Sequence, residues 1–293
     1  MKTKVIYSFV FVLFTTIPAS AQKSDPLKAD FNPPNEIKGM SLVWNDEFNN
    51  TGKPHTANWK YENGFVRNEE LQWYQPNNAV CSNGLLIIEG KREIVGNPDY
   101  AAKSANWKRN RESAMYTSAS INTRGHQQFL FGRFEIRARI DTATGAWPAI
   151  WTLGVTKPWP SNGEIDIMEF YRVKETPTIL ANYAWGTIQR SVAKWDDLKK
   201  PLSDFTKNDH DWAKKFHIWR MDWGKDSISI YLDDQLLNST LLSQTVNPDG
   251  FNPFLQSHYI LLNLALGRNG GDPSKSKFPI KYEVDYVRVY QDN

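Results

Sequence analysis

The sequence predicts an all-β fold, a single sandwich of two packed antiparallel sheets. Short segments alternate apolar and polar residues with a period of two, as strands with one buried face do. Turn-forming residues separate these segments, and no long amphipathic helix interrupts them. This pattern is typical of a β-sandwich, in which the inward faces of two sheets build one core.

The N-terminal residues are expected to lie outside this fold. Residues 1–21 combine a basic start, an apolar run and a small-x-small ending, so they are predicted to be a cleavable signal peptide. The apolar run is too short for a membrane span. The cleavage point has no cysteine, so a lipoprotein anchor is not expected. We therefore expect an exported protein, periplasmic or extracellular, with a linker or loose arm over residues 22–40 and one domain over residues 41–293.

Five segments are predicted to be strands: three alternate apolar and polar residues, and two, 84–90 and 259–266, are apolar enough to be more fully buried. In one of them, Phe134 and Ile136 point to one side while Arg133 points to the other. The five segments, in chain order, are 84–90, 132–140, 226–237, 259–266 and 284–290. Two longer polar insertions, 91–116 and 186–212, are expected to be loops, which often build binding sites on such a sandwich.

Composition excludes several classes of function. The net charge of +3 falls to about +1 without the two lysines of the signal peptide, so there is no broad basic surface for nucleic acid. Cys81 is the single cysteine, so no intrachain disulfide forms and the core must stabilise the fold. Aromatic residues make up 13% of the chain, which is high enough that some rings are expected on display. One local basic patch remains, formed by Lys103, Lys108, Arg109 and Arg111.

The segment GEIDIMEF places three carboxylates among apolar neighbours. Glu164 and Asp166 share one face of a strand, whereas Glu169 lies an odd number of residues away and would face the other side. One extra residue in a β-bulge, at Ile167 or Met168, would bring all three carboxylates to one face. The alternative is an ordinary solvated strand face, and the apolar neighbours argue against it.

Such a carboxylate set suits glycoside hydrolysis. Two carboxyl groups about 5 to 5.5 Å apart work by double displacement: one attacks the anomeric carbon, and the other protonates the leaving oxygen and then activates water. Asp166, between the two glutamates, would hydrogen-bond the nucleophile and help keep the acid protonated through like-charge repulsion.

GEIDIMEF resembles the signature of glycoside hydrolase family 16, E-x-D-x-x-E in its bulged form. LVWNDEF, FGRFEIRARI, GAWPAIWTLG and YEVDYVRVY resemble further segments of that family, so the likeness covers nearly the whole chain after the signal peptide. The resemblance implies a β-jelly-roll sandwich of two antiparallel sheets with an open concave cleft. It also implies that Glu164 is the nucleophile, Glu169 the acid/base and Asp166 an assisting group.

Aromatic and polar residues near the carboxylates are expected to bind the glycan. Trp147 and Trp159 each precede a proline near a turn and are expected to be exposed in the cleft as stacking surfaces, whereas Trp151 is assigned to the core. By the resemblance, one further segment reaches the negative subsites, through Arg67, Asn68 and Glu70.

No catalytic metal or cofactor is expected. The five histidines lack ligand spacing, and no nucleophile elbow or phosphate-binding glycine loop is present. The resemblance implies a structural calcium between the first and last strands, for which Glu47 and Asp285 are the matching residues; the alternative is that both are surface residues. The expected partner is a glycan substrate alone, bound by a monomer without nucleic acid or a membrane span.

The overall pattern is similar to that of laminarinases but departs from it in three places. Asn182 and Trp185 stand where laminarinases carry a histidine, Arg268 and Asn269 replace a glycine-tryptophan ending, and residues 91–116 form a basic insertion. These changes suit a pocket that recognises an axial hydroxyl or an N-acetyl group. The first interpretation is therefore an endo-β-galactosidase acting on N-acetyllactosamine-type chains of host mucin O-glycans, and the second an endo-β-1,3-glucanase. A third is a non-catalytic carbohydrate-binding lectin, which would have no need for three crowded acids.

Overall fold

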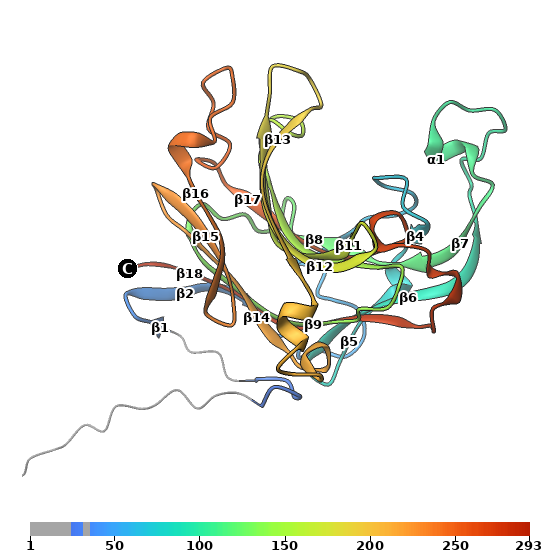
Figure 1. Cartoon of the computed structure of the whole chain (residues 1–293), viewed down its shortest axis with the longest axis horizontal. Helices are drawn as coiled ribbons and strands as arrows, with labels where there is room; N and C mark the ends of the chain where they lie inside the picture. The colour runs from blue at the N-terminus through green and yellow to red at the C-terminus, as the bar shows by residue number, and fades with distance from the viewer. Residues whose placement is uncertain (1–24, 32–35) are drawn as a thin grey trace, which may run out of the picture.

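The computed structural model describes residues 25–31 and 36–293, and these fold into two sheets packed face to face (Figure 1). The predicted signal peptide lies outside the described residues. The outer sheet has eleven strands. In chain order they are β1 (Glu36–Ile37), β2 (Met40–Asp46), β4 (Gln72–Tyr74), β5 (Ala79–Ser82), β6 (Leu85–Gly96), β7 (Ser113–Ser118), β9 (Gly132–Ile140), β14 (His217–Trp223), β15 (Ser227–Leu232), β16 (Gln235–Leu241) and β18 (Ile280–Asp292).

The inner sheet has seven strands and curves so that the face turned away from the outer sheet is concave (Figure 1). In spatial order they are β13 (Ala193–Pro201), β12 (Thr176–Gly186), β11 (Glu164–Val173), β10 (Ala146–Gly154), β17 (His258–Leu266), β8 (Ser120–Asn122) and β3 (Lys60–Tyr61). Strand pairing is antiparallel except between β4 and β7. This architecture confirms the predicted all-β sandwich.

Helical structure is confined to short turns. The α-helical turns are α1 (Trp107–Asn110) and α2 (Ser203–Thr206). The 3₁₀ turns are η1 (Pro76–Asn78), η2 (Trp212–Lys214), η3 (Leu242–Gln244), η4 (Arg268–Gly270) and η5 (Pro273–Lys275). In the described part of the chain, no helix has the length and apolar character needed to cross a membrane.

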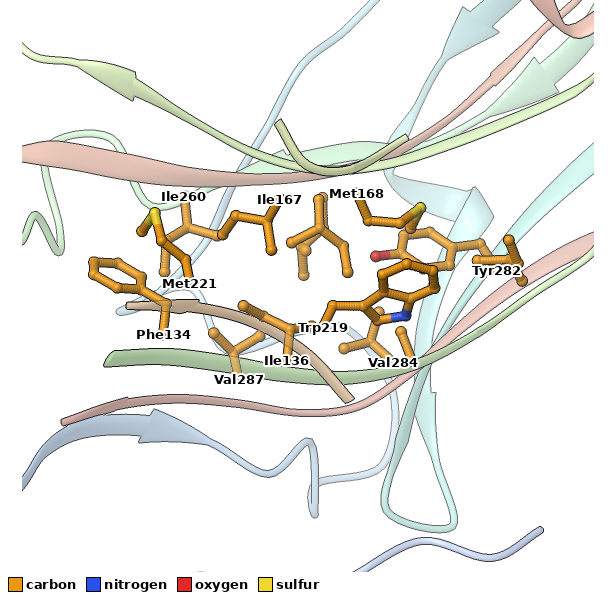
Figure 2. Packing of buried hydrophobic residues seen from close by; sticks show 14 of the residues in the cluster. Phe134, Ile136, Ile167, Met168, Trp219, Met221, Ile260, Tyr282, Val284 and Val287 are labelled. Carbon is orange, nitrogen blue, oxygen red and sulfur yellow. The ribbon is translucent and has the colours of Figure 1, made fainter. Parts of the chain in front are cut away.

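Alternating side chains from the two sheets meet to form the core (Figure 2). Ile136 of β9 and Val287 of β18 rise from the outer sheet, and Ile167 of β11 and Ile260 of β17 descend from the inner sheet. All four are fully buried. This core holds the inner sheet in place, so that the opposite face of the sheet can carry polar chemistry.

The two polar insertions contain more strand than the sequence indicated. Residues 91–116 prolong β6 to Gly96 and begin β7 at Ser113, with α1 between them. Residues 186–212 include β13, which pairs with β12 along its whole length and forms one edge of the inner sheet. Both segments rise at opposite ends of the concave face (Figure 1).

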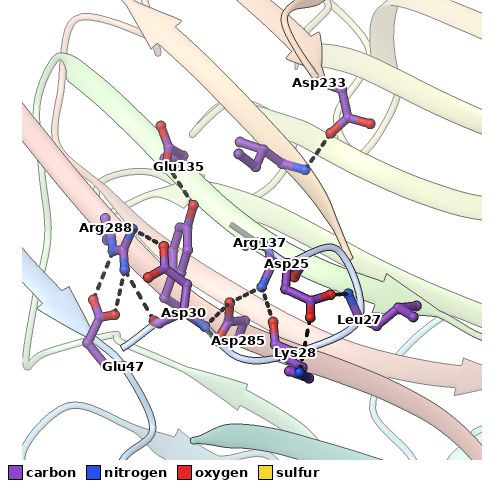
Figure 3. A network of polar contacts seen from close by, with 12 residues as sticks. Asp25, Leu27, Lys28, Asp30, Glu47, Glu135, Arg137, Asp233, Asp285 and Arg288 are labelled. Atoms are coloured by element: carbon purple, nitrogen blue, oxygen red, sulfur yellow. Dashed lines mark hydrogen bonds and ion pairs between the residues drawn. The ribbon is translucent and has the colours of Figure 1, made fainter. Parts of the chain in front are cut away.

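The N-terminal segment 25–31 is not the loose arm that its composition suggested. It lies on the outer sheet, where buried Arg137 donates hydrogen bonds to the carbonyls of Lys28 and Asp25 at 2.7 and 2.6 Å (Figure 3). The backbone N–H of Asp30 donates to the carboxylate of Asp285 at 3.1 Å. Two of these acceptors are main-chain carbonyls, and the third, Asp285, is far away in the sequence. The polarity of the side chains in segment 25–31 therefore could not predict that the segment packs on the outer sheet.

Candidate active site

A β-bulge in β11 brings the three carboxylates to the concave face. Asp166 lies opposite Asn182 of β12, and Glu169 lies opposite Leu180, so β11 advances three residues where β12 advances two. The extra residue lies within Ile167–Met168, and both of these side chains are fully buried in the core. The bulge predicted from the odd spacing is therefore confirmed.

Each carboxylate is held by hydrogen bonds from neighbouring strands or loops. The indole N–H of Trp147 donates to Glu169 at 2.8 Å, and that of Trp159 donates to Glu164 at 2.5 Å. The Asn182 amide donates to Asp166 at 3.1 Å and to Glu169 at 3.2 Å. The carboxylates therefore have fixed orientations before any ligand binds.

The carboxylates line a cleft of about 820 Å³ on the concave face. Seven of the eight residues predicted to bind substrate line the same cleft: Arg67, Asn68, Glu70, Trp147, Trp159, Asn182 and Arg268. They come from segments far apart in the sequence, which the curvature of the inner sheet brings together.

The chain matches a known family along most of its length. The model of glycosyl hydrolases family 16 matches residues 67–288. The chain belongs to this family. A beta-glucanase of Rhodothermus marinus is 31% identical over 98% of this chain and 96% of its own length. A keratan-sulfate endo-1,4-beta-galactosidase of Sphingobacterium multivorum is 26% identical over 85% of this chain and 55% of its own length.

Solved structures agree with this assignment. A structure reported with endo-acting O-glycanases from members of the human gut microbiota, which initiate mucin breakdown, superposes with a TM-score of 0.80. It is 33% identical and covers 89% of this chain and 94% of its own. This family 16 chain is therefore a glycoside hydrolase of the endo-glycanase type.

Burial sets the protonation of the family 16 carboxylates. It is the largest cause that raises the pKa of Glu169 to about 7, and the charges of Glu164 and Glu70 add to the shift. Burial also raises the pKa of Asp166 well above its ordinary value, with the charges of Glu169 and Glu164 next. The pKa of Glu164 is raised by burial, and hydrogen bonds from Trp159 and Asp166 oppose this shift.

The hydrogen bond expected between Asp166 and Glu164 is present, and it lowers the pKa of Glu164. The raised pKa of Asp166 favours its protonated form, and the expected repulsion by Asp166 is not among the causes that raise the pKa of Glu169. The repulsion that keeps Glu169 protonated comes from Glu164 and Glu70, while a hydrogen bond with Asp166 lowers the pKa of Glu169. The charges that raise the pKa of Glu169 are therefore those of Glu164 first and Glu70 second.

On one side of β11, a half-buried arginine forms part of the cleft wall. The Arg67 guanidinium lies 5.0 Å from the Trp151 ring centroid and is ion-paired with Glu62. Its Nη1 is buried without a hydrogen-bond partner among the described residues. Arg111 and Arg268 fix the adjoining turn by donating to the main-chain carbonyls of residues 68–70. The basic insertion thus positions the turn that carries Arg67.

The tryptophans differ from the sequence expectation in three cases. Trp147 lines the cleft but is only 7% exposed, because its ring packs against Tyr171 and its N–H is turned to Glu169. Trp151, assigned to the core, also lines the cleft. Trp185, predicted to bind substrate, lies three residues beyond Asn182 on β12, so the alternation of the strand turns it away from the cleft into the core. Trp159 is 41% exposed, as expected.

The proposed calcium ligands are both engaged by arginines. Glu47 accepts two hydrogen bonds from Arg288, and Asp285 is ion-paired with Arg137 (Figure 3). Within residues 25–31 and 36–293, no group of three or more acidic, histidine or cysteine side chains forms a metal site. Calcium takes six to eight oxygen ligands, and two carboxylates neutralised by arginine do not fit that requirement.

One wall of the cleft was not predicted from the sequence. Trp195, Asp197 and Lys199 of β13 line it, because alternate residues of this edge strand face the concave side. The period-two spacing of these residues was present in the sequence. Polar residues on both faces of β13 hid the strand signal.

Proposed function

We propose that this protein is a retaining endo-β-galactosidase that cuts within N-acetyllactosamine-type chains, such as those of mucin O-glycans. The observation that carries the retaining mechanism is the carboxylate set that the β11 bulge aligns on the cleft face. Two of its members differ in environment. The charges of Glu164 and Glu70 help burial to raise the pKa of Glu169 to about 7, whereas hydrogen bonds from Trp159 and Asp166 and the charge of Arg67 lower the pKa of Glu164 against the effect of burial. One carboxyl poised to hold a proton beside one stabilised as an anion is what double displacement requires.

The proposed reaction has two steps. The Glu164 carboxylate attacks the anomeric carbon, and Glu169 gives its proton to the glycosidic oxygen as that bond breaks. Glu169, now ionised, then takes a proton from water, which attacks the anomeric carbon and releases Glu164. Asp166 stabilises the departing Glu164 carboxylate through its hydrogen bond.

Two polar atoms of cleft residues have no hydrogen-bond partner among the described residues, and they favour a sugar that carries a hydrogen-bond donor and a hydrogen-bond acceptor close together. The Asn182 Oδ1 is buried without a partner in the described structure, while its Nδ2 bonds two carboxylates. It therefore suits an N–H or hydroxyl donor, such as an acetamido group or an axial hydroxyl. The unpartnered Nη1 of Arg67 suits a hydroxyl acceptor. Similarity to an O-glycanase and to a keratan-sulfate galactosidase supports the same substrate class.

The second candidate function is endo-β-1,3-glucan hydrolysis. The similarity to a beta-glucanase extends over nearly the whole chain, at an identity close to that of the O-glycanase structure. Overall identity therefore does not separate the two substrates. The choice of galactose-containing chains rests on Asn182 and Arg268, which replace residues typical of laminarinases.

A substrate panel tests the proposal. Purified protein is incubated with mucin O-glycans, desulfated keratan-type chains and laminarin, and the products are separated by chromatography with mass detection. We expect oligosaccharides of several residues from the first two substrates and none from the Glu164→Gln control. Gluco-oligosaccharides from laminarin alone would replace the galactosidase assignment with the glucanase one. The absence of products from every substrate would contradict glycosidase function.

A further inference from the structure

Strand β13 carries a row of side chains that faces the cleft and has no role in the proposed chemistry. Trp195, Asp197 and Lys199 line the cleft wall on the side of β11 opposite Arg67. Asp197 of β13 lies opposite Asn182 of β12 in the strand pairing, and Asn182 donates hydrogen bonds to Asp166 and Glu169. The row on β13 is therefore separated from the carboxylates of β11 by one strand, β12. Adjacent strands lie about 4.8 Å apart, which is close to the length of one sugar residue.

Trp195 is a large apolar ring left in solvent. It is 43% exposed, and no ring contact to it is found among the described aromatic side chains. The tryptophans in the interior of the sandwich pack against other rings instead. A flat exposed indole in a cleft that already contains hydrolytic carboxylates suits the C–H face of a sugar ring.

The polar members of the row define the chemistry of that sugar. The Lys199 ammonium is ion-paired with the Asp197 carboxylate. The pair has no net charge, so it does not favour a sulfated or carboxylated ring. It does offer hydrogen-bond donors and acceptors to hydroxyl or acetamido groups. The row therefore matches a neutral hexose or N-acetylhexosamine.

The two sides of the cleft differ in depth. On the Arg67 side, Glu70 and Trp151 in the cleft are almost completely buried, while Asn68 and Arg268 beside them are exposed. On the β13 side, the three side chains are all exposed. In double displacement, one half of the glycan stays covalently bound while the other half departs and an acceptor enters. A deep side suits the half that stays, and an open side suits the half that leaves.

We propose that Trp195, Asp197 and Lys199 form a subsite for the leaving half of the glycan, binding a neutral sugar on the reducing-end side of the scissile bond. This inference rests on the proposed retaining mechanism. The same subsite receives an acceptor sugar in the second step. The acceptor hydroxyl gives its proton to Glu169, its oxygen forms a bond to the anomeric carbon, and the bond to Glu164 breaks.

Two substrates with the same glycone test the subsite. The wild-type protein is first assayed on the panel above, and the glycone of the chain it cuts is prepared in two forms. One form keeps at least two sugars on the leaving side, and the other has 4-nitrophenol as the leaving group. Trp195→Ala is expected to lower kcat/KM on the first form by about tenfold or more, since it removes a stacking surface, and to change the second less than about twofold.

Matched variants control for general damage. Lys199→Ala is expected to affect the sugar-leaving substrate, whereas Lys200→Ala, on the opposite face of β13 over the Phe205 ring, should affect neither. Trp195→Phe should restore part of the activity because it keeps an aromatic face. Transfer products formed with added free oligosaccharide should fall in Trp195→Ala relative to hydrolysis products.

Each outcome decides the proposal. Equal losses on both substrates would place β13 on the glycone side or in a structural role, and no loss on either would leave it without a binding role; both results overturn the subsite. These results are distinct from a failure of the proposed substrate, which appears as wild-type cleavage of laminarin alone. A wild-type protein that cuts no chain overturns both proposals.

Discussion

At the scale of single residues, neighbouring groups assign different roles to chemically similar carboxyls. Glu164 and Glu169 are the same amino acid on the same strand, and burial raises the pKa of both. Like charges raise the pKa of Glu169 further, whereas hydrogen bonds from Trp159 and Asp166 favour the anion of Glu164. The sequence predicted these two positions because their spacing demanded a bulge. It did not predict Glu70 as the charge acting on Glu169, because 99 residues separate the two in the chain.

Azide distinguishes the nucleophile from the acid/base. In Glu164→Gly, the small cavity admits azide, which attacks an activated β-glycoside directly and gives the α-glycosyl azide. In Glu169→Ala, the covalent intermediate still forms, so azide attack gives the β-glycosyl azide. We expect each variant to lose at least about 10²-fold in rate without azide, the lower range for a missing acid/base group. The products are identified by NMR of the anomeric proton. Swapped product configurations would reverse the two assignments.

The pH profile of kcat/KM reports the free-enzyme carboxyls. Glu169 must be protonated, so activity is expected to fall as pH rises through about 7. Glu164 must be ionised, so activity falls on the acidic side as pH drops through its pKa, which lies above the ordinary glutamate value. Burial raises the pKa of Glu70 and the charge of Arg67 lowers it, and in its ionised form Glu70 opposes ionisation of Glu169. Glu70→Gln removes that charge. The pKa of Glu169 then drops, and the alkaline limb moves to lower pH.

Asp166→Asn is the comparison for that experiment. Because the raised pKa of Asp166 favours its protonated form, the substitution removes little charge and keeps a hydrogen-bond donor to Glu164. We expect a smaller displacement of the alkaline limb than in Glu70→Gln. A larger displacement in Asp166→Asn would restore the original expectation that Asp166 acts by repulsion.

At the scale of elements, one strand was predictable and another was not. β11 combines apolar residues with carboxylates in a pattern that only a bulge reconciles, and the structure has that bulge. No residue of β13 is fully buried, so the strand has no apolar face. Without such a face, the periodicity of apolar residues in the sequence does not predict a strand there. Trp185 shows the same limit: its type suggested binding, but only the register of β12 reveals which face it occupies.

The bulge makes a prediction about stability. In a regular strand, only one of two successive residues faces the core, whereas Ile167 and Met168 are both fully buried. We therefore expect Ile167→Ala and Met168→Ala each to lower the free energy of unfolding by about 2–5 kcal/mol. Chemical denaturation followed by tryptophan fluorescence provides the measurement, with Leu236→Ala, at an exposed position on β16, as the control. A loss below about 1 kcal/mol in either core variant would argue against the bulge.

At the scale of the whole molecule, the sandwich was predictable because alternation in many short segments leaves few other ways to bury their apolar faces. The docking of segment 25–31 was not, because its contacts are mainly main-chain carbonyls that accept from Arg137 and a main-chain N–H that donates to Asp285. Main-chain groups are the same in every residue type except proline, so many sequences with the same backbone conformation could make these hydrogen bonds. The curvature that assembles the cleft is likewise a property of the complete sheet, which no single segment encodes.

Removing the N-terminal segment tests its contribution to the molecule. A chain beginning at Glu36 leaves the Arg137 guanidinium without two carbonyl acceptors, and loss of hydrogen bonds to a charged group costs about 1.5–3 kcal/mol. We expect its thermal unfolding midpoint to fall by several degrees relative to a chain beginning at Asp25. Activity at 25 °C should be retained, because the segment and the cleft lie on different sheets. An unchanged midpoint would show that water replaces the lost acceptors.

β18 occupies the middle of the outer sheet, although it is the final strand in chain order. It pairs with β9 on one side and with β2 and β6 on the other. Among the described strands of the outer sheet, β18 therefore joins three groups: β9 with β14, β15 and β16, then β6 with β4, β5 and β7, and finally β2 with β1. Closure of such distant segments is slow, so the chain must spend its synthesis in partly assembled states with open strand edges. We therefore expect the outer sheet to be completed late in folding, after β18 has been made, and the edges of its three groups of strands to stay open until then.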